Sequence, residues 1–408
     1  MNLKILFLLI IVGLCILMPD ACYAFLEKDV HLLNMQNGLA DNTISAVYKD
    51  KEGLVWFGTR NGLSRYDGRQ ITNFELKNGY PDISNIKEIF DGILAFVNDG
   101  VLSAFDLKEE QFLPVVSSSG EAIASRGLLQ KNDSLVWVIS GNELRLMKRC
   151  VSKEKKLRFQ MEKSYSGWGN HEDALVAMTY SSDGKKICLI DEKGRIILLD
   201  TTNLKSPRII DLGYTEKILV NSVLYDDGRI WISTTSKGII YYNERTGKIK
   251  NLTYGVNPAS DRLSHTDVFS VIRLNENKYL AATWNGYTVL TIDRNNQDEI
   301  STEVYSNTSS LMHRNLETRM ISAYYDSHGI LWIGTDGGGV IWSDLRMQFY
   351  NRFYQDRHNE ICSIIADDEH YIWLATYHKG YLQPIITQYF IDNKSEIWLL
   401  FLIAHSKR

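Results

Sequence analysis

The chain has 408 residues, with 45 Lys and Arg against 49 Asp and Glu, which gives a formal net charge of -4 at pH 7. These charges are scattered and form no basic stripe, so nucleic acid is not expected as a partner. The length is sufficient to bury a full core without a disulfide framework. Aromatic residues make up 11% of the chain, which suits both a β-rich core and a carbohydrate-facing surface.

Residues 1–24 have the pattern of a secretory signal peptide. Lys4 supplies a positive charge, residues 5–18 are apolar, and Cys22-Tyr-Ala24 is a small-x-small cleavage site. The apolar run is shorter than the ~20 residues that cross a bilayer. We therefore expect cleavage after Ala24, an exported chain, and no membrane span beyond the signal peptide. Lipid attachment at Cys22 is the alternative, although residues 19–21 are a poor lipobox.

One phrase recurs along the chain after the signal peptide. Its clearest copies are DKEGLVWFGTRNGL at residues 50–63 and DSHGILWIGTDGGGV at residues 326–340. Weaker copies repeat at intervals of roughly 40 to 50 residues, the length of one four-stranded propeller blade. The positions equivalent to the tryptophan are Trp56, Ala95, Trp137, Cys188, Trp231, Leu280, Trp332 and Trp373.

Each unit has the pattern of short strands separated by tight turns. Residues 44–48 alternate, residues 50–53 form a polar turn, residues 54–57 form an apolar run, and Asn61-Gly62 is a second turn. The tryptophan is expected between neighbouring blades, as the largest block of buried apolar area. The sequence therefore predicts an all-β fold, with a seven-bladed β-propeller over residues 25–355. An incomplete start of a second propeller is predicted over residues 356–408.

Closing the ring requires an outer strand for the seventh blade. Two segments alternate as an edge strand does, Val30–Met35 at the N-terminus and Gln348–Tyr354 after the seventh unit. Closure matters because it removes exposed sheet edges that would otherwise pair with other chains. The sequence leaves both alternatives open.

Residues 38–68, GLADNTISAVYKDKEGLVWFGTRNGLSRYDG, resemble the two-component regulator propeller repeat. That repeat builds the periplasmic sensor region of hybrid two-component system proteins of Bacteroides-type bacteria. The resemblance covers the repeats from about Phe25 to Leu382 and is loose in the units at Ala95 and Cys188. It implies a periplasmic receptor in a Gram-negative bacterium that recognises glycan-derived oligosaccharides for signal transduction.

The sequence departs from the plan of that family in its C-terminal part. Family members continue through a second propeller, a β-sandwich, a membrane helix, a histidine kinase, a receiver and a DNA-binding domain. This sequence stops one unit into the second propeller, so we expect a truncated sensor without kinase activity. Residues 356–408, which end in the apolar run Ile397–Ala404, are expected to be poorly ordered, and the C-terminal part of this segment is expected to lack proper partner strands. Family sensors are homodimers, but without the sandwich we expect a monomer here.

Alternate turns of a propeller lie on opposite faces of the disc. The Thr-x-x-Gly turns, such as residues 59–62 and 335–338, share one face with the segments that enter the inner strands. Amides, guanidinium groups and an aromatic ring on this face suit sugar recognition. Asn42, Ser236 and Asp267 are expected on the same face, near the central opening. The candidate ligand-binding residues are Arg60, Asn61, Lys237, Trp284, Asn285, Asp336 and Arg319.

The alternative is that these residues only shape turns, because Asn and Asp favour such turns for conformational reasons. Trp284 differs, since it stands in a turn where core packing would not require it. Two rival functions remain, a protein-interaction propeller and a propeller glycosidase or lyase. Glycoside hydrolysis needs a pair of carboxylates, whereas the recurring Asp residues are spread around a ring. The sequence contains no metal, nucleotide or hydrolase motif, so neither a metal nor another cofactor is predicted.

Overall fold

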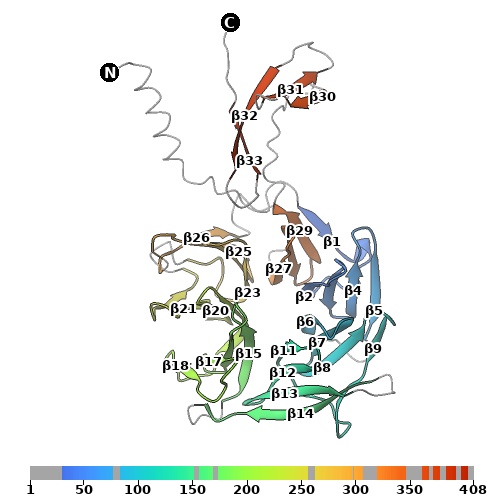
Figure 1. Ribbon diagram of the computed structural model, residues 1–408, viewed down its shortest axis with the longest axis vertical. Helices are drawn as coiled ribbons and strands as arrows, with labels where there is room; N and C mark the ends of the chain where they lie inside the picture. Colours follow the sequence, from blue (N-terminus) through green and yellow to red (C-terminus); the bar gives the residue numbers. More distant parts are fainter. Residues whose placement is uncertain are drawn as a thin grey trace. The chain divides into compact units, whose positions relative to one another are not determined.

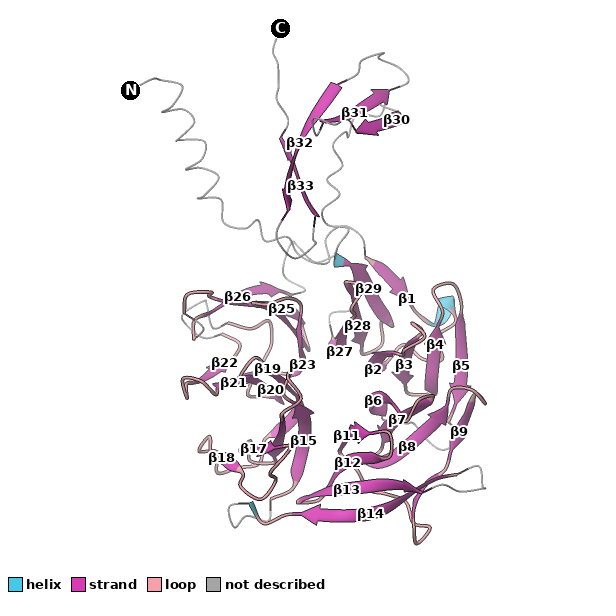
Figure 2. Ribbon diagram, in the orientation of Figure 1, coloured by secondary structure: helices cyan, strands magenta, loops and turns pink. Residues whose placement is uncertain are grey.

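The computed structural model describes residues 30–76, 83–150, 156–168, 173–255, 262–296, 298–306 and 319–345, and four strands between residues 361 and 402. The elements in these residues are β-strands, together with the short 3-10 helix η1 (Met35–Asn37) (Figure 2). The predicted signal peptide lies outside the described residues. The chain divides into two compact units, Met1–Met347 and Gln348–Arg408. Within the described residues, none of the helical segments has the length and apolar character needed to cross a bilayer.

The first unit contains seven sheets, which are antiparallel except for one parallel strand in blade 3. The first four blades follow one another along the chain. Blade 1 contains β2 (Ile44–Lys49), β3 (Val55–Thr59), β4 (Gly62–Tyr66) and β5 (Ile71–Glu75). Blade 2 contains β6 (Ile83–Ile89), β7 (Ile93–Asn98), β8 (Val101–Asp106) and β9 (Gln111–Leu113). Blade 3 contains β11 (Gly127–Asn132), β12 (Leu135–Ser140), β13 (Glu143–Cys150) and β14 (Leu157–Tyr165), with β10 (Val115–Ser117) added in parallel to β14. Blade 4 contains β15 (Leu175–Tyr180), β16 (Lys186–Asp191), β17 (Ile196–Asp200) and β18 (Arg208–Ile210).

The remaining three sheets complete the ring. Blade 5 contains β19 (Leu219–Asp226), β20 (Arg229–Thr235), β21 (Ile239–Asn243) and β22 (Ile249–Leu252). Blade 6 contains β23 (Val268–Arg273), β24 (Lys278–Thr283), β25 (Gly286–Ile292) and β26 (Ile300–Tyr305). Blade 7 contains β27 (Met320–Tyr325), β28 (Ile330–Thr335), β29 (Val340–Asp344) and β1 (His31–Leu33).

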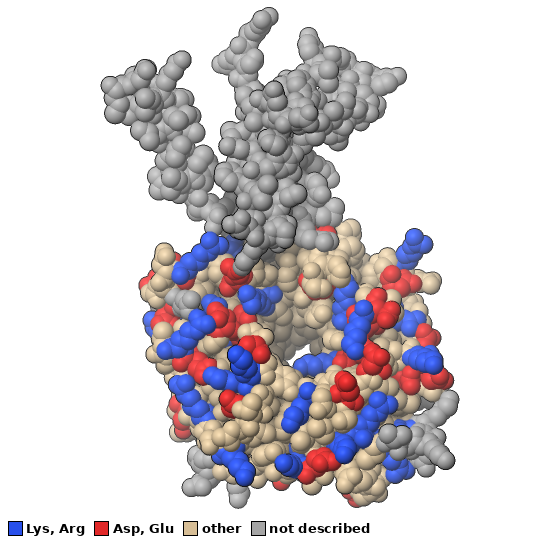
Figure 3. Space-filling model, in the orientation of Figure 1, with Lys and Arg blue, Asp and Glu red and all other residues tan. Residues whose placement is uncertain are grey.

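The first strand of each blade lies at the centre of the ring. These inner strands are in contact from one blade to the next, and β27 of blade 7 returns to β2 of blade 1 (Figure 1). The predicted seven-bladed β-propeller is therefore confirmed. Figure 3 shows the hollow at the centre of this unit, with basic and acidic side chains interspersed around it.

The N-terminal strand β1 closes the seventh blade. It pairs antiparallel with β29, with His31 opposite Trp342 and Leu33 opposite Val340. The His31 and Trp342 rings stack, with centroids 4.1 Å apart. Of the two predicted ways to close the ring, the structure therefore has the N-terminal one.

The recurring tryptophans of blades 1, 3, 5 and 7 are buried between blades, as predicted. Trp56 of blade 1 packs in one cluster with Ile83 and Leu94 of blade 2. Trp231 of blade 5 lies 4.9 Å from the Tyr279 ring of blade 6, measured between ring centroids. Such contacts bury a large apolar area at each junction, which fixes one blade against the next.

The second unit is one antiparallel sheet with the strand order of a blade. Its strands are β30 (Ile361–Ala366), β31 (Tyr371–Thr376), β32 (Gln383–Ile391) and β33 (Ile397–Leu402). The expectation that the apolar tail lacks partner strands is wrong, because β33 pairs with β32 from Ile386 opposite Leu402 to Ile391 opposite Ile397. Because β32 and β33 are consecutive in the chain and pair antiparallel, their backbone N–H and C=O groups bond to each other as in a hairpin.

A buried ion pair joins blade 7 to blade 1. Lys49 Nζ donates to Asp326 Oδ2 over 2.7 Å, and Asp326 Oδ1 accepts from the backbone N–H of Ile330 over 2.9 Å. Burial alone would raise the pKa of Asp326, but these hydrogen bonds hold it below the ordinary value for a carboxyl group. The pair therefore stabilises the folded state above the unfolded-state pKa of about 4, and this contribution is lost as the pH falls through the folded-state pKa.

Asp326→Asn is expected to lower the free energy of unfolding by about 2 kcal/mol at pH 7, because Lys49 loses its charged partner. The difference from the wild type should shrink towards pH 3, where the wild-type carboxyl group is protonated. Urea unfolding at both pH values measures this. The control is Asp91→Asn, which removes an exposed inter-blade partner of Lys51 and should cost no more than about 0.5 kcal/mol. Equal losses in the two variants would contradict the prediction.

Candidate functional site

The structure places the seven predicted residues on one face, in four consecutive blades. Each residue lies either in the turn between the second and third strands of a blade or immediately before an inner strand. Arg60 and Asn61 belong to blade 1, Lys237 to blade 5, Trp284 and Asn285 to blade 6, and Arg319 and Asp336 to blade 7.

Asp336 connects three of the segments that meet on this face. Its Oδ1 accepts from Arg60 Nη2 over 3.4 Å and from the Thr43 hydroxyl over 3.3 Å, while Oδ2 accepts from Arg319 Nη1 over 3.1 Å. The Asp336 carboxylate is mostly covered, whereas the Arg60 side chain is 57% exposed. One carboxylate thus orients two guanidinium groups across the junction of blades 7 and 1, and leaves Arg60 accessible to a ligand.

Trp284 extends this cluster over blade 6. The residue is 37% exposed, and the Arg319 guanidinium carbon lies 5.7 Å from the centre of its ring. The Phe269 ring also contacts Trp284, with ring centroids 5.8 Å apart at an angle of 38°. Arg60, Asp336, Arg319 and Trp284 therefore form a continuous series of contacts, which we call the Arg–Trp cluster.

The other three predicted residues are not drawn into this series. Asn61 Nδ2 donates to the Ala40 carbonyl over 2.9 Å, and the Asn285 N–H donates to the Thr283 hydroxyl over 3.2 Å. The first bond ties the β3–β4 turn to the segment that precedes β2, and the second lies within the β24–β25 turn. Lys237 is exposed at the tip of its turn, beside Ser236, whose φ of 69° is a left-handed conformation.

Phe269 was not predicted from the sequence. It sits at a β-bulge, because the register of β23 against β24 shifts between Val268 and Ser270. A bulge turns a side chain away from the regular alternation of a strand. Phe269 is accordingly only partly buried, between the buried residues of the inner strand and Trp284.

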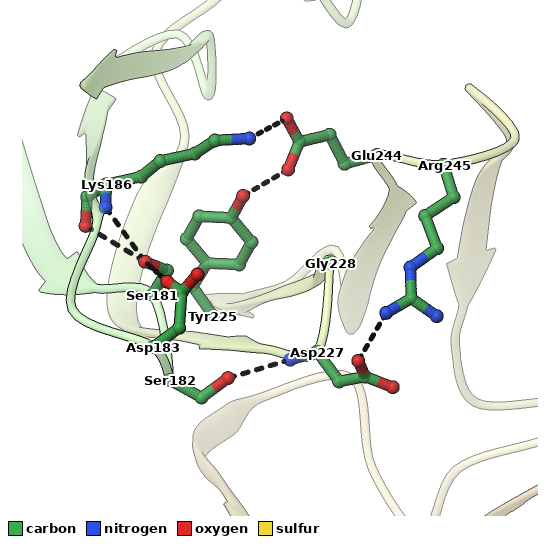
Figure 4. Close-up of a pocket in the computed structure, with 9 residues that line it drawn as sticks. All are labelled: Ser181, Ser182, Asp183, Lys186, Tyr225, Asp227, Gly228, Glu244 and Arg245. Carbon is green, nitrogen blue, oxygen red and sulfur yellow. Dashed lines mark hydrogen bonds and ion pairs between the residues drawn. The ribbon is translucent and has the colours of Figure 1, made fainter.

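A pocket of about 420 Å³ lies on the opposite face, between blades 4 and 5 (Figure 4). Its polar groups are largely engaged with one another: Glu244 with Lys186 and Tyr225, and Asp227 with Arg245. The pocket is lined by Ser181, Ser182, Asp183, Lys186, Tyr225, Asp227, Gly228, Glu244 and Arg245.

Two carboxyl groups of this pocket, Glu244 and Asp183, have pKa values below their ordinary values. Burial raises the pKa of Glu244, but hydrogen bonds from Lys186 and Tyr225 outweigh this effect and hold it below its usual value. The hydroxyl of Ser181 lowers the pKa of Asp183. Acid catalysis of glycoside cleavage needs a carboxyl group whose pKa is raised, so neither group is suited to that role. Among the residues that the structure describes, no three His, Cys, Asp or Glu side chains gather as metal ligands.

The fold and these surfaces define a seven-bladed β-propeller with an exposed cluster suited to non-covalent recognition. Residues 38–61 match the family described as two component regulator propeller, which confirms the resemblance predicted from the sequence. No curated protein matches the chain.

Several solved structures share the fold at low sequence identity. One is the extracellular domain from B. thetaiotaomicron assigned to the hybrid two component system BT3049, at 17% identity, with a TM-score of 0.57, over 91% of this chain and 52% of that one. The corresponding domain of BT4673 gives 17% identity, a TM-score of 0.57, and 92% and 51% coverage. A chain of the mitotic checkpoint complex gives 12% identity, a TM-score of 0.53, and 79% and 93% coverage. The chain thus spans about half the length of the first two domains.

Proposed function

We propose that this protein is a ligand-sensing propeller of a two-component regulator, located outside the cytoplasm, and that it recognises glycan-derived oligosaccharides. The match to the regulator propeller family and the similarity to extracellular sensor domains support the class. The periplasm is the proposed location, and the monomer is the proposed state of this chain.

The Arg–Trp cluster is the single observation that carries the ligand proposal. A sugar presents an apolar C–H face and a rim of hydroxyl groups, so its recognition calls for a flat ring beside fixed donors and acceptors. Trp284 offers the ring, Arg60 and Arg319 offer donors, and the Asp336 carboxylate holds both guanidinium groups in place. A ligand seated here would bridge blades 6, 7 and 1.

Trp284→Ala and Arg60→Ala are each expected to weaken oligosaccharide binding about tenfold, which corresponds to about 1.4 kcal/mol. The reason is the loss of a stacking surface in one variant and of a donor in the other. Isothermal titration calorimetry with defined plant and host oligosaccharides of two to six units measures the effect.

Arg245→Ala is the matched control for Arg60→Ala. Both arginines are about half exposed and both pair with an aspartate, but Arg245 lies on the opposite face in the pocket of Figure 4. Its replacement should leave the affinity unchanged. A loss in Arg245→Ala with none in Arg60→Ala would move the site to the other face and reject the Arg–Trp cluster.

A further inference from the structure

Exposed apolar side chains concentrate beside the Arg–Trp cluster. Among the described residues, large apolar side chains that are exposed lie either on outer strands or on the face of the cluster. On that face, Leu219 and Tyr254 belong to blade 5 and Trp284 to blade 6, and Tyr254 is 60% exposed. Met35 of η1, 56% exposed, is a further member of this set, near blades 7 and 1. Leu219 and Tyr254 extend the exposed apolar side chains from Trp284 towards blade 5.

Asp267 organises the surface between these two aromatic side chains. Its carboxylate accepts from the backbone N–H of Ser236 over 2.8 Å, which holds the β20–β21 turn of blade 5. Its backbone carbonyl accepts from the Trp284 N–H over 3.0 Å, which holds the β24–β25 turn of blade 6. One residue thus sets the relative positions of the turns that carry Lys237 and Trp284.

His265 links Asp267 to Tyr254. The Asp267 N–H donates to His265 Nδ1 over 3.0 Å, and the His265 and Tyr254 rings have centroids 6.5 Å apart at 36°. Tyr254, His265, Asp267 and Trp284 form a connected row in which an aromatic ring lies at each end and polar groups lie between them. Two stacking surfaces separated by hydrogen-bonding groups match two sugar units joined by a polar linkage.

We propose that this row is a second subsite of the ligand site, with Tyr254 as its stacking surface and Asp267 as its positioning residue. The inference rests on the proposed function and extends it. The ligand is an oligosaccharide long enough to contact Trp284 with one unit and Tyr254 with another. Shorter fragments occupy the Arg–Trp cluster alone.

Calorimetry with a series of lengths, from two to six units of whichever oligosaccharide binds the wild type, tests the proposal. Tyr254→Ala should lower the affinity for the longest member about tenfold and leave the shortest binding member unchanged, whereas Trp284→Ala should weaken all lengths. Tyr254→Phe should retain wild-type affinity because the ring remains. The matched control is Ile249→Ala, which truncates another exposed apolar side chain of blade 5, on its outer strand β22.

Asp267 gives an independent test of the row. Asp267→Ala should reduce the affinity for long oligosaccharides about tenfold, and Asp267→Asn should restore it, because an amide oxygen can still accept from the Ser236 N–H. Equal affinities of Tyr254→Ala and wild type at every length would overturn the second subsite while leaving the Arg–Trp cluster in place. Wild-type protein that binds no oligosaccharide, or Trp284→Ala without effect at any length, would instead reject the proposed function together with the subsite.

Discussion

Replacing Trp231 by alanine is expected to lower the free energy of unfolding by about 4 kcal/mol, which is in the range for large-to-small changes of a fully buried tryptophan. Trp231 has no exposed surface, and its ring lies 4.6 Å from Tyr241 and 4.9 Å from Tyr279, measured between centroids. Because Tyr279 belongs to the next blade, the cavity would open at the junction of blades 5 and 6. Urea unfolding followed by circular dichroism measures the loss.

Cys188→Ala is the control, because Cys188 occupies the position of Trp231 in blade 4 and is also fully buried. It removes only a sulfur atom, so we expect a loss of about 1 kcal/mol. The loss for Trp231→Phe should lie between the two, since Trp231 Nε1 has no hydrogen-bond partner in the described part of the chain. Comparable losses for Trp231→Ala and Cys188→Ala would mean that the large ring does not hold these blades together.

Replacing Lys87 by methionine is expected to stabilise the protein by about 1–2 kcal/mol at pH 7, because the side chain is partly exposed and water offsets some of the cost of its charge. Lys87 lies on the inner strand β6, and its cross-strand partner is Ala95. In blades 1, 3, 5 and 7 a tryptophan occupies the position of Ala95. Burial lowers the pKa of Lys87 to about 8. The folded chain therefore disfavours the charged ammonium group, and methionine keeps the apolar chain without that charge.

The pH dependence provides the check on Lys87. Its pKa is lower in the folded chain than in the unfolded chain, where it is about 10.5, so the unfolded chain binds more protons between these values. The stability of the wild type should consequently rise from pH 8 to pH 10, whereas that of Lys87→Met should stay flatter over this range. Urea unfolding at pH 7, 8.5 and 9.5 measures both. A variant that is less stable than the wild type at pH 7 would contradict the prediction.

The number and order of the blades could be predicted because each blade carries its own short-range signals. A tryptophan or a smaller replacement recurs in the second strand, and glycines mark the turns on both sides, as in residues 50–63. Successive turns of a blade lie on opposite faces of the disc, so the strand order also predicted that the candidate residues share one face. The strand that closes the ring did not follow, because two segments had the same alternation and only long-range pairing distinguishes them.

Contacts between side chains of different blades could not be predicted. The repeat places an aspartate before the tryptophan in blades 1 and 7, yet the two act differently. Asp50 accepts from Trp56 Nε1 over 2.7 Å, while Asp326 is bonded to Lys49. Trp332 Nε1 has no hydrogen-bond partner among the described residues. The same motif thus gives different hydrogen bonds, because the neighbouring blade decides which donor arrives.

The candidate site was predictable in composition but not in arrangement. Trp284 could be singled out because an aromatic residue in a turn has no packing reason to be there, and Tyr254 carries the same signal beside Gly255. Phe269 could not be singled out, because a β-bulge in a strand cannot be recognised from the pattern of residue types. The sharing of Asp336 by Arg60 and Arg319 depends on the closed ring, which brings distant parts of the chain together.

The pairing of β1 with β29 also sets the order in which the protein can be completed. The ribosome makes His31 early, but its partner Trp342 is synthesised almost at the end of the propeller. Until then, the outer edge of blade 7 does not exist and the early strands of blade 1 lack their neighbour on one side. Such edges pair readily with those of other chains, and contacts so distant in sequence form slowly. We therefore expect the incomplete propeller to be most prone to pairing with other chains until residue 342 is available.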